Sequence, residues 1–458
     1  MSPSSRHLFG TDGIRARFGE SPLDRSTVTS LAAQLAAMLR EAAPRHERAG
    51  DSPLVVLGGD TRESTPVICR WLAEGLTAGG ARVQYAGVIP TPGIAWLTRE
   101  LGAAAGAVVS ASHNPWPDNG IKLIDPRGFK WSEEEEAALE RRLASASVEV
   151  PALAADLPAD SSLRERYLER LAATLGPAGR PLAGLEVVLD AGNGAASFYA
   201  GELFERLGAA VTRLHVAPDG RNVNERCGST APEEMAARVV AEGADLGAAF
   251  DGDADRCILA DERGEVRDGD AILYLWATCL RAQGKLEPPR IVATTMSNLG
   301  LERALDREAI RIERCNVGDR YVVETLQSEG LALGGEQSGH IVHLGLSSTG
   351  DGLLTAVQMA AIVRQAGRPL SELLAGFRRY PQILRNVRVA EKPDLETLPR
   401  VAAAKRSVEE RLGADGRLVL RYSGTEPLAR VMIEGPDQPS IEAMAGELAG
   451  AIQEAIGA

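Results

Sequence analysis

The chain has 458 residues, of which 44% are hydrophobic and 25% charged, enough for roughly three domains of average size. That composition is typical of a globular protein and excludes a disordered or fibrous one. The formal net charge is −13 and no run of basic residues is present, which argues against a nucleic-acid partner. An anionic ligand would need its arginines gathered in one place.

Cysteine usage and hydropathy indicate the compartment. The cysteines form no CxxC pair and have no metal-ligand spacing, which is typical of free thiols in a reducing compartment. They are Cys69, Cys227, Cys257, Cys279 and Cys315. The first residues, MSPSSRHLFG, lack the apolar core of a secretion signal, and no apolar run reaches the ~18 residues of a membrane span. We expect a cytoplasmic protein without a membrane partner.

Short apolar runs alternate with Ala- and Leu-rich amphipathic stretches along most of the chain. Three strand-like runs are each followed by a helix-like stretch: PLVVLGGD (53–60) by 65–80, LEVVLDAGNG (185–194) by 199–209, and RIVATTM (290–296) by 298–307. This β-α-β rhythm predicts an α/β fold in which helices cover mixed or parallel sheets. DAGNGAAS imitates a dinucleotide fingerprint but has serine in place of its last glycine, so we interpret it as a strand-to-helix connection.

The last part of the chain has a different pattern. Two strand-like runs (417–424 and 429–436) flank a tight turn, and an amphipathic helix over 440–457 closes the sequence. A smaller α+β domain is expected there. Proline-bearing or irregular boundaries then divide the chain into four domains around a central cleft, three of related α/β topology and one C-terminal, over residues 1–155, 156–257, 258–378 and 379–458.

The stretch VVSASHNPWPDNGIKL (108–123) places many polar residues directly after a buried strand. Two prolines and Asn-Gly prevent a regular helix, so a loop at the carboxyl end of the strand is predicted. Open α/β sheets bind their ligands at that edge. Ser112 would be displayed at the tip beside His113, and Lys122 would return on the next strand. A polar surface turn is the alternative.

The stretch AAFDGDADRCILADE (248–262) places three alternating carboxylates after an apolar strand. Asp251, Asp253 and Asp255 would repel one another unless a cation neutralised them, and oxygen-only ligands suit Mg²⁺, Mn²⁺ or Ca²⁺. An EF-hand loop is a poor alternative because Arg256 stands where that loop needs glycine and strands are expected on both sides. A solvated acidic turn is the other alternative.

Two further loops combine glycine with polar side chains. LGGEQSGHIV (333–342) sets Glu336, Gln337, Ser338 and His340 among glycines, and its carboxylate beside a hydroxyl suits sugar hydroxyls, with a plain loop as the alternative. LRYSGTEPLARVM (420–432) offers guanidinium and hydroxyl donors to a phosphate, with an ordinary hairpin turn as the alternative. Arg15 in LFGTDGIRA and Arg62 in GGDTREST follow Gly-rich turns and are either site residues or surface arginines.

Together these stretches resemble the α-D-phosphohexomutase superfamily, from FGTDGIRA through SASHNP, DGDADR and GGEQSGH to RYSGTEP. The resemblance covers nearly the whole chain in the family's order. FGTDGIR, VGDRYV (317–322) and GGEQSGH are similar to the phosphoglucosamine mutase branch; the phosphomannomutase/phosphoglucomutase branch typically has methionine in place of Gln337 and histidine in place of Asp319. Ala16, where glycine usually stands, is a departure that removes no functional group.

The resemblance implies a reaction and a set of ligands. Glucosamine 6-phosphate and glucosamine 1-phosphate would be interconverted through phosphorylated Ser112 and a glucosamine or glucose 1,6-bisphosphate. One Mg²⁺ would bind a phosphoserine oxygen together with Asp251, Asp253 and Asp255. Glu336 and Ser338 would hold sugar hydroxyls. The unreactive phosphate would contact Arg421, Ser423, Gly424, Thr425 and Arg430.

The resemblance also places residues at the point of phosphoryl transfer, namely Lys122, Arg15, His113, His340 and Arg256. Lys122 is the preferred proton acceptor, because a lysine among arginines and a metal can have a lowered pKa. A homodimer is possible. The alternatives are a mutase for glucose or mannose phosphates, a metal-dependent sugar phosphatase and a non-catalytic phosphosugar sensor. A sensor would have no need for the serine and the three aspartates.

Overall fold

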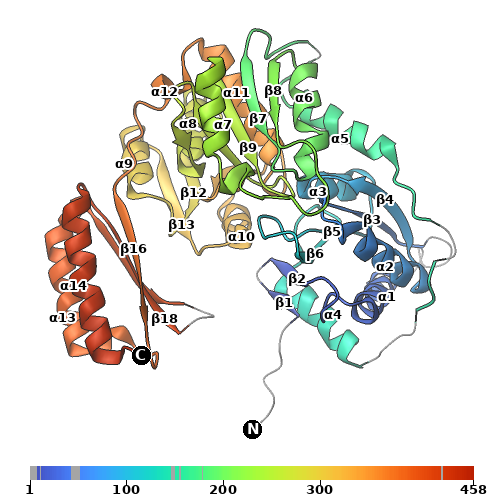
Figure 1. The fold of residues 1–458 in the computed structure, drawn as a ribbon, viewed down its shortest axis with the longest axis horizontal. Coiled ribbons are helices and arrows are strands. Elements are labelled where there is room, and N and C mark those ends of the chain that lie inside the picture. Colours follow the sequence, from blue (N-terminus) through green and yellow to red (C-terminus); the bar gives the residue numbers. More distant parts are fainter. Residues whose placement is uncertain are drawn as a thin grey trace. The chain divides into compact units, whose positions relative to one another are not determined.

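The computed structural model describes residues 8–10, 12–42, 52–145, 150–153, 156–177, 179–423 and 427–458. The chain folds into two compact units (Figure 1). Unit 1 comprises Met1–Met296 and Ile312–Leu374, and unit 2 comprises Ser297–Arg311 and Ala375–Ala458. No helix in the described ranges has the length and apolar content that crossing a membrane requires.

The first sheet of unit 1 has six strands in the order β1-β2-β6-β5-β3-β4. Their bounds are β1 Phe9–Gly10, β2 Gly13–Arg17, β3 Leu54–Gly59, β4 Arg82–Val88, β5 Ala105–Val109 and β6 Asp118–Ile124. β3, β4 and β5 are parallel, whereas β6 runs antiparallel to β5 and β2. The accompanying helices are α1 (Arg25–Ala42), α2 (Thr65–Ala78), α3 (Thr91–Glu100) and α4 (Glu133–Ser145). The apolar faces of α1 and α2 pack in one buried core with β3 and β5.

The second sheet has the order β11-β10-β9-β7-β8. The strands are β7 (Glu186–Asp190), β8 (Ala210–Leu214), β9 (Leu246–Phe250), β10 (Cys257–Asp261) and β11 (Val266–Arg267). The helical segments that precede or connect these strands in the chain are α5 (Ser161–Ala173), η1 (Ala195–Phe198), α6 (Ala200–Arg206), η2 (Gly228–Thr230) and α7 (Glu233–Glu242). The expected edge at 257/258 falls at the start of β10. Because β10 pairs antiparallel with β9, this sheet continues to Arg267.

The third sheet, β13-β12-β14-β15, is smaller. It contains β12 (Arg290–Thr294), β13 (Arg311–Cys315), β14 (Leu333–Gly335) and β15 (Ile341–His343). The following helices accompany it in the chain: α8 (Gly269–Ala282), α10 (Asp319–Glu329), α11 (Gly352–Ala366) and α12 (Leu370–Leu373). α11 also packs against β9 and β10, so an element from the third expected domain covers the second sheet.

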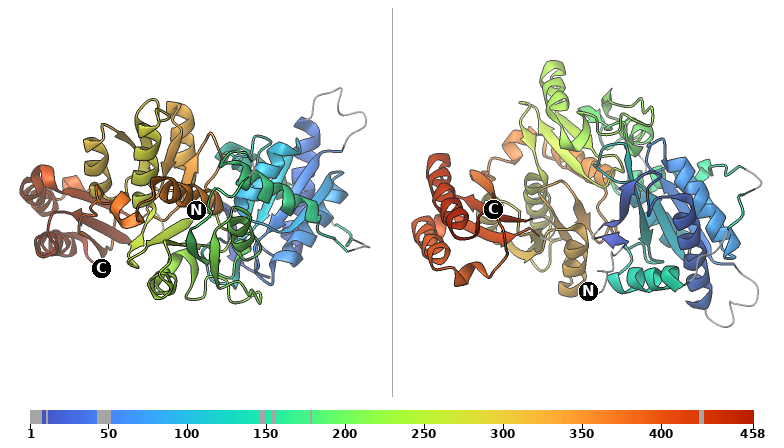
Figure 2. Two further views of the ribbon diagram at one scale, coloured as in Figure 1. Left: turned by 90° about the horizontal axis from the view of Figure 1, so that it is seen from above. Right: turned by 60° about the horizontal axis from the view of Figure 1, so that its bottom comes forward.

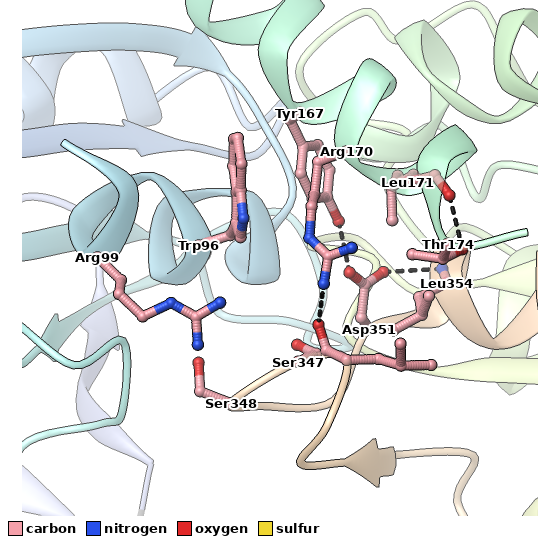
Figure 3. Close-up of a pocket in the computed structure, with 11 residues that line it drawn as sticks. Trp96, Arg99, Tyr167, Arg170, Leu171, Thr174, Ser347, Ser348, Asp351 and Leu354 are labelled. Carbon is pink, nitrogen blue, oxygen red and sulfur yellow. Dashed lines mark hydrogen bonds between the residues drawn. The ribbon is translucent and has the colours of Figure 1, made fainter. Parts of the chain in front are cut away.

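The start of α11 lies in a small junction with α3 and α5 (Figure 3). Asp351 caps α11 by accepting from Leu354 N at 2.9 Å, and it accepts from the Tyr167 hydroxyl of α5 at 2.9 Å. Arg170 donates to the Leu346 carbonyl at 2.7 Å. The cavity here has room for about one water, with a volume of ≈ 10 Å³. This junction is a packed structural contact.

Unit 2 has a three-stranded antiparallel sheet of order β16-β18-β17. Its elements are α9 (Leu299–Arg307), β16 (Gln382–Arg388), η3 (Leu395–Thr397), α13 (Pro399–Leu412), η4 (Gly413–Asp415), β17 (Arg417–Tyr422), β18 (Leu428–Glu434) and α14 (Gln438–Ile456). α13 and α14 lie side by side on one face of the sheet (Figure 2). α9 belongs to unit 2 because its N-cap, Asn298, donates to the buried Glu434 carboxylate at 3.0 Å.

Candidate active site

Ser112 lies in the loop after β5, at the carboxyl end of that strand, as the sequence predicts. Its side chain is buried and its backbone is left-handed, with φ of 52°, which is uncommon for a residue other than glycine. Ser112 Oγ donates to Asp251 Oδ2 at 2.6 Å and lies 3.3 Å from His113 Nδ1. A Cβ on Gly252 would stand 2.6 Å from the Ser112 carbonyl oxygen, so only glycine fits where the two loops meet.

A buried network holds this strained serine in place. Arg62 donates to the Ser112 carbonyl at 3.0 Å, and the Asn224 amide donates to the same oxygen at 2.9 Å. Arg62 is fully buried and paired with Asp60. Asp60 also accepts from the Ser110 hydroxyl, which in turn accepts from Ser112 N at 2.8 Å. The Ser112 backbone is therefore held at its carbonyl oxygen and at its N–H by these side chains, whose hydrogen bonds leave Ser112 Oγ to Asp251.

The three aspartates gather in the turn between β9 and β10. Asp251, Asp253 and Asp255 are buried, and one carboxylate oxygen from each lies within 4.8 Å of the others. Asp253 Oδ1 and Asp255 Oδ1 are buried without a hydrogen-bond partner in the described structure. Unpartnered buried oxygens are costly unless a cation binds them. The donor set fits a hard divalent cation such as Mg²⁺. Strands β9 and β10 flank the turn, which excludes an EF-hand.

The electrostatics of this trio also favour a cation. Burial, together with the charges of Asp255 and Asp253, raises the pKa of Asp251 well above its usual range. Burial alone would raise the pKa of Asp253 as well, but Lys122 and the Thr91 hydroxyl hold it below the usual value. Thr91 Oγ1 donates to Asp253 at 2.6 Å. Asp253 is thus kept charged by Lys122 and Thr91, whereas at Asp251 the nearby Arg256 does not outweigh burial and the other two carboxylates.

Lys122 is buried on β6 and contacts carboxylates. Its Nζ lies 3.0 Å from Asp253, 3.4 Å from Asp12 and 3.5 Å from Asp255. Burial alone would lower the pKa of Lys122, but these three acids outweigh burial and raise the pKa well above its ordinary value. The expected lowered pKa is therefore wrong, because the nearest charges are carboxylates and one of them, Asp12, was not foreseen.

A second lysine, which is partly buried, extends this network toward the third sheet. Lys130 Nζ bonds both Asp12 and Asp319. Asp319 begins α10 and lies 3.6 Å from His340 Nε2. Lys130 thereby links the first sheet of unit 1 to the first residue of α10, inside one compact unit. The sequence offered only a faint signal for Lys130, a charged residue within the apolar run GFKW.

Several cationic and imidazole groups near the trio retain unused donors. Arg15 Nε, Arg256 Nε and both ring nitrogens of His340 are buried without a hydrogen bond in the described structure. Arg15 is paired with Asp12, and Arg256 N donates to Asp251 at 3.2 Å. An anionic phosphoryl group can satisfy such donors.

His113, the neighbour of Ser112, has a depressed pKa. Burial, followed by the charges of Arg256 and Arg15, lowers the pKa of His113 to about 4. Its imidazole is therefore neutral at physiological pH, and a ring nitrogen can accept a proton.

The expected sugar loop joins the same unit. Glu336 follows β14 and accepts from Gly318 N at 3.0 Å and from the Ser338 hydroxyl at 3.3 Å. The Gly339 carbonyl accepts from Cys257 N at 3.0 Å, which ties the loop to the strand that follows the aspartates. Glu336 and Ser338 thus lie on a loop that is tied to β10, the strand directly after the three aspartates.

The expected phosphate-binding residues lie in unit 2. Arg421 on β17 and Arg430 on β18 are directly opposite each other across the antiparallel pair. Like charges in that position are destabilising unless an anion separates them. Arg430 lies 3.5 Å from the Ser423 hydroxyl, and Lys392 donates to the Ser423 carbonyl at 2.6 Å. Gly424 and Thr425 lie outside the described residues.

Four consecutive segments match the domains of one protein family. The matches are phosphoglucomutase/phosphomannomutase alpha/beta/alpha domain I over residues 6–149, domain II over 165–264, domain III over 268–380 and the C-terminal domain over 384–451. The chain belongs to the phosphoglucomutase/phosphomannomutase family. The expected membership of the phosphohexomutases and the α/β fold are both confirmed, and the chain is an enzyme of the mutase (isomerase) class.

Individual relatives and solved structures show which members of the family this chain is similar to. The chain is 46% identical over 456 residues to the phosphoglucosamine mutase of Solibacter usitatus (strain Ellin6076), covering 99% of this chain and 100% of the relative. A phosphoglucomutase/phosphomannomutase family protein from Burkholderia thailandensis has the same fold, with a TM-score of 0.80 at 24% identity over 98% of each chain. Aspergillus fumigatus N-acetylphosphoglucosamine mutase in complex with GlcNAc-6P and magnesium gives a TM-score of 0.66 at 19% identity, over 99% of this chain and 96% of the other.

Proposed function

We propose that this enzyme interconverts glucosamine 6-phosphate and glucosamine 1-phosphate, with Ser112 as the phosphoryl carrier. The observation that carries the proposal is the 2.6 Å contact of Ser112 Oγ with Asp251, in a cluster that has unpartnered carboxylate oxygens. The amino sugar is supported by the 46% identity to a phosphoglucosamine mutase over 99% of the chain. GGEQSGH and VGDRYV agree with that branch.

Asp251, Asp253 and Asp255 would hold one Mg²⁺ together with an oxygen of phosphorylated Ser112. The unpartnered Asp253 and Asp255 oxygens support this assignment. A bound divalent cation would offset the negative charge of the transferring phosphoryl group.

The protein residues then carry the group in two transfers. In the first, the bond between phosphorus and Ser112 Oγ breaks and a bond forms to the free sugar hydroxyl, whose proton is passed on so that Ser112 regains its hydroxyl. The product is a 1,6-bisphosphate. In the second, the bond between the other phosphorus and its sugar oxygen breaks, a bond forms to Ser112 Oγ, the serine proton is passed on to the freed sugar oxygen, and the isomeric monophosphate is released. No phosphate is consumed, so the enzyme needs only a phosphorylated start or an activating 1,6-bisphosphate.

Proton handling falls to neutral groups rather than to Lys122. His113 Nδ1 lies 3.3 Å from Ser112 Oγ, and the low pKa of His113 keeps it uncharged, so it can take the serine proton in the second transfer. Lys122 remains an ammonium group, and we assign it to charge stabilisation with Arg15, Arg256 and His340.

The remaining roles concern the parts of the sugar phosphate that do not react. Glu336 and Ser338 would bind sugar hydroxyls. Arg421, Ser423 and Arg430 would bind the unreactive phosphate, and Lys392 would position the Ser423 backbone. The paired arginines of β17 and β18 support this assignment because an anion relieves their repulsion. A cytoplasmic location and a homodimer stay predictions.

The test compares substrates and follows the covalent intermediate. Purified protein with Mg²⁺ and glucose 1,6-bisphosphate should convert glucosamine 6-phosphate faster than glucose or mannose 6-phosphate. Intact mass should show one added phosphoryl group. Ser112→Ala should lose that group and at least ~10³-fold in kcat, whereas Ser328→Ala, an exposed serine on α10, should keep both.

Each other outcome has a defined meaning. A preference for mannose phosphate would assign the enzyme to the sister branch. Steady release of inorganic phosphate would indicate a phosphatase. A phosphorylated Ser112→Ala protein with normal turnover would refute the proposed carrier.

A further inference from the structure

Unit 1 contains a second group of metal-ligating side chains, in the second sheet. Asp190, His215 and Cys227 each offer one ligand atom, and these atoms lie within 4.8 Å of one another. Asp190 ends β7, His215 follows β8, and Cys227 precedes η2. β7 and β8 are parallel neighbours, so their carboxyl ends meet at one edge of the sheet. The three residues are distant from one another in sequence, which is why no cysteine spacing revealed the group.

The donor atoms of this group are only partly used. Asp190 accepts from Gly192 N and from Gly228 N, both at 2.9 Å, one on each oxygen, and each oxygen retains a lone pair. His215 Nδ1 is buried and has no hydrogen-bond partner among the described residues when the ring is neutral; Asp190 Oδ1 lies 3.0 Å away and would form an ion pair with it if the ring were protonated. When the ring is neutral, the lone pair of this nitrogen faces a carboxylate oxygen, and a cation bound by both atoms would satisfy them.

The surroundings of His215 match a metal-binding histidine. Its Nε2 lies 3.4 Å from Glu234 Oε2 on α7. If Nδ1 binds a cation, Nε2 carries the proton and can donate it to Glu234. Metal-ligating histidines are commonly oriented by such a carboxylate. The His215 side chain is 22% exposed, so water can reach the group from one side and supply a fourth ligand.

We propose that Asp190, His215 and Cys227 bind a second divalent cation, of the borderline-soft class of Zn²⁺, with water as a fourth ligand. The choice of cation follows from the donors. Thiolate and imidazole prefer Zn²⁺ or Co²⁺ to Mg²⁺, whereas three carboxylates prefer Mg²⁺. When the bond between Cys227 Sγ and the cation forms, the thiol loses its proton to solvent. Because the thiol must lose this proton to bind, affinity should increase with pH.

The second site would brace the loop that holds Ser112. Asn224, three residues before Cys227, donates its backbone N–H to the Gly192 carbonyl at 2.9 Å and its side-chain amide to the Ser112 carbonyl at 2.9 Å. A cation that joins Asp190, His215 and Cys227 would tie the segments on both sides of Asn224. That consequence rests on the proposed role of Ser112, but cation binding itself does not.

The test uses the untagged full-length chain after chelator treatment, titrated with Co²⁺ in excess Mg²⁺. One equivalent of Co²⁺ should produce near-ultraviolet thiolate-to-cobalt charge-transfer absorption and release one proton, detected with an indicator dye. Cys227→Ser should lose the absorption. Cys279→Ser, a matched control outside the group, should keep it. His215→Gln should weaken Co²⁺ binding at least ~10-fold.

A variant of an exposed residue separates loss of Co²⁺ binding from failure to fold. Glu234 is 57% exposed, and Glu234→Gln should leave the circular dichroism unchanged while weakening Co²⁺ binding roughly 10-fold. No charge-transfer absorption in wild type, or equal absorption in Cys227→Ser, would overturn the proposal. Wild-type protein that shows the charge-transfer absorption but has no Mg²⁺-dependent mutase activity would instead count against the proposed function.

Discussion

The aspartate turn and the junction of α3, α5 and α11 both bury carboxylates in unit 1, but they treat the charge in opposite ways. Asp253 accepts from the Lys122 ammonium at 3.0 Å, and its pKa is held below the usual value. Asp351 accepts from a hydroxyl and a backbone N–H, both uncharged (Figure 3). Burial raises the pKa of Asp351 to about 6.

The difference shows how burial serves function in one place and structure in the other. In the turn, protein cations keep a carboxylate charged and leave oxygens unsatisfied, so the site is ready for a divalent ion. In the junction, every Asp351 oxygen has a neutral donor, and burial shifts the pKa of the carboxyl upward. A buried carboxylate therefore indicates a ligand site when its charge is retained but its hydrogen bonds are incomplete.

The largest loss of kcat is expected from a substitution in the aspartate turn. Asp253→Asn removes the negative charge but keeps the shape, so kcat should fall at least ~10²-fold because the cation and Lys122 lose a shared partner. Asp351→Asn is the matched control and should keep kcat within about 2-fold. Steady-state kinetics over a Mg²⁺ titration measures both. Equal losses in the two variants would mean that the turn is no more functional than the junction.

A smaller effect is expected from the network beneath Ser112. Arg62→Lys keeps the charge that Asp60 needs, but a single ammonium cannot also bond the Ser112 carbonyl as the planar guanidinium does. We expect kcat to fall about 10-fold with little change in KM, and phosphorylation of Ser112 to slow in parallel. Arg221→Lys, an exposed arginine paired with Glu63, should change neither value. An unchanged phosphorylation rate in Arg62→Lys would remove Arg62 from the positioning network.

The smallest effect concerns stability at the junction. The folded pKa of Asp351 lies near 6, above its unfolded value near 3.8, so its stabilising contribution is full below about pH 4 and is lost as the pH rises through 6. The loss amounts to about 3 kcal/mol at most. Asp351→Asn keeps the cap and has no charge to bury, so its stability relative to wild type should increase from pH 4 to pH 7. Urea unfolding of both proteins across that range measures the difference; a pH-independent difference would contradict the assignment.

Local pattern was enough to predict most elements. The runs around 53–60, 185–194 and 290–296 became β3, β7 and β12, and each expected helix follows its strand. Alternation and amphipathic spacing are properties of consecutive residues, so they can be read without a fold. The Ser112 loop and the aspartate turn were found for the same reason, since each is one short polar segment at the end of a strand.

The pattern was less informative where an element crosses between sheets or units. α9 follows β12 in the expected rhythm but packs in unit 2, because the Asn298–Glu434 contact joins residues far apart in the chain. α11 packs on a sheet formed earlier in the sequence. Local periodicity gives the apolar face of a helix but not the surface that it covers.

The sequence by itself determined the strands, the helices, the serine loop and the three aspartates, because each depends on neighbouring residues. Only the tertiary structure decided which charges surround Lys122, how Arg62 and Asn224 hold Ser112, and that Asp190, His215 and Cys227 come together. The physical reason is range: a pKa or a ligand set depends on distances of a few ångströms in space, and residues that are not neighbours in the chain meet only when the sheets fold.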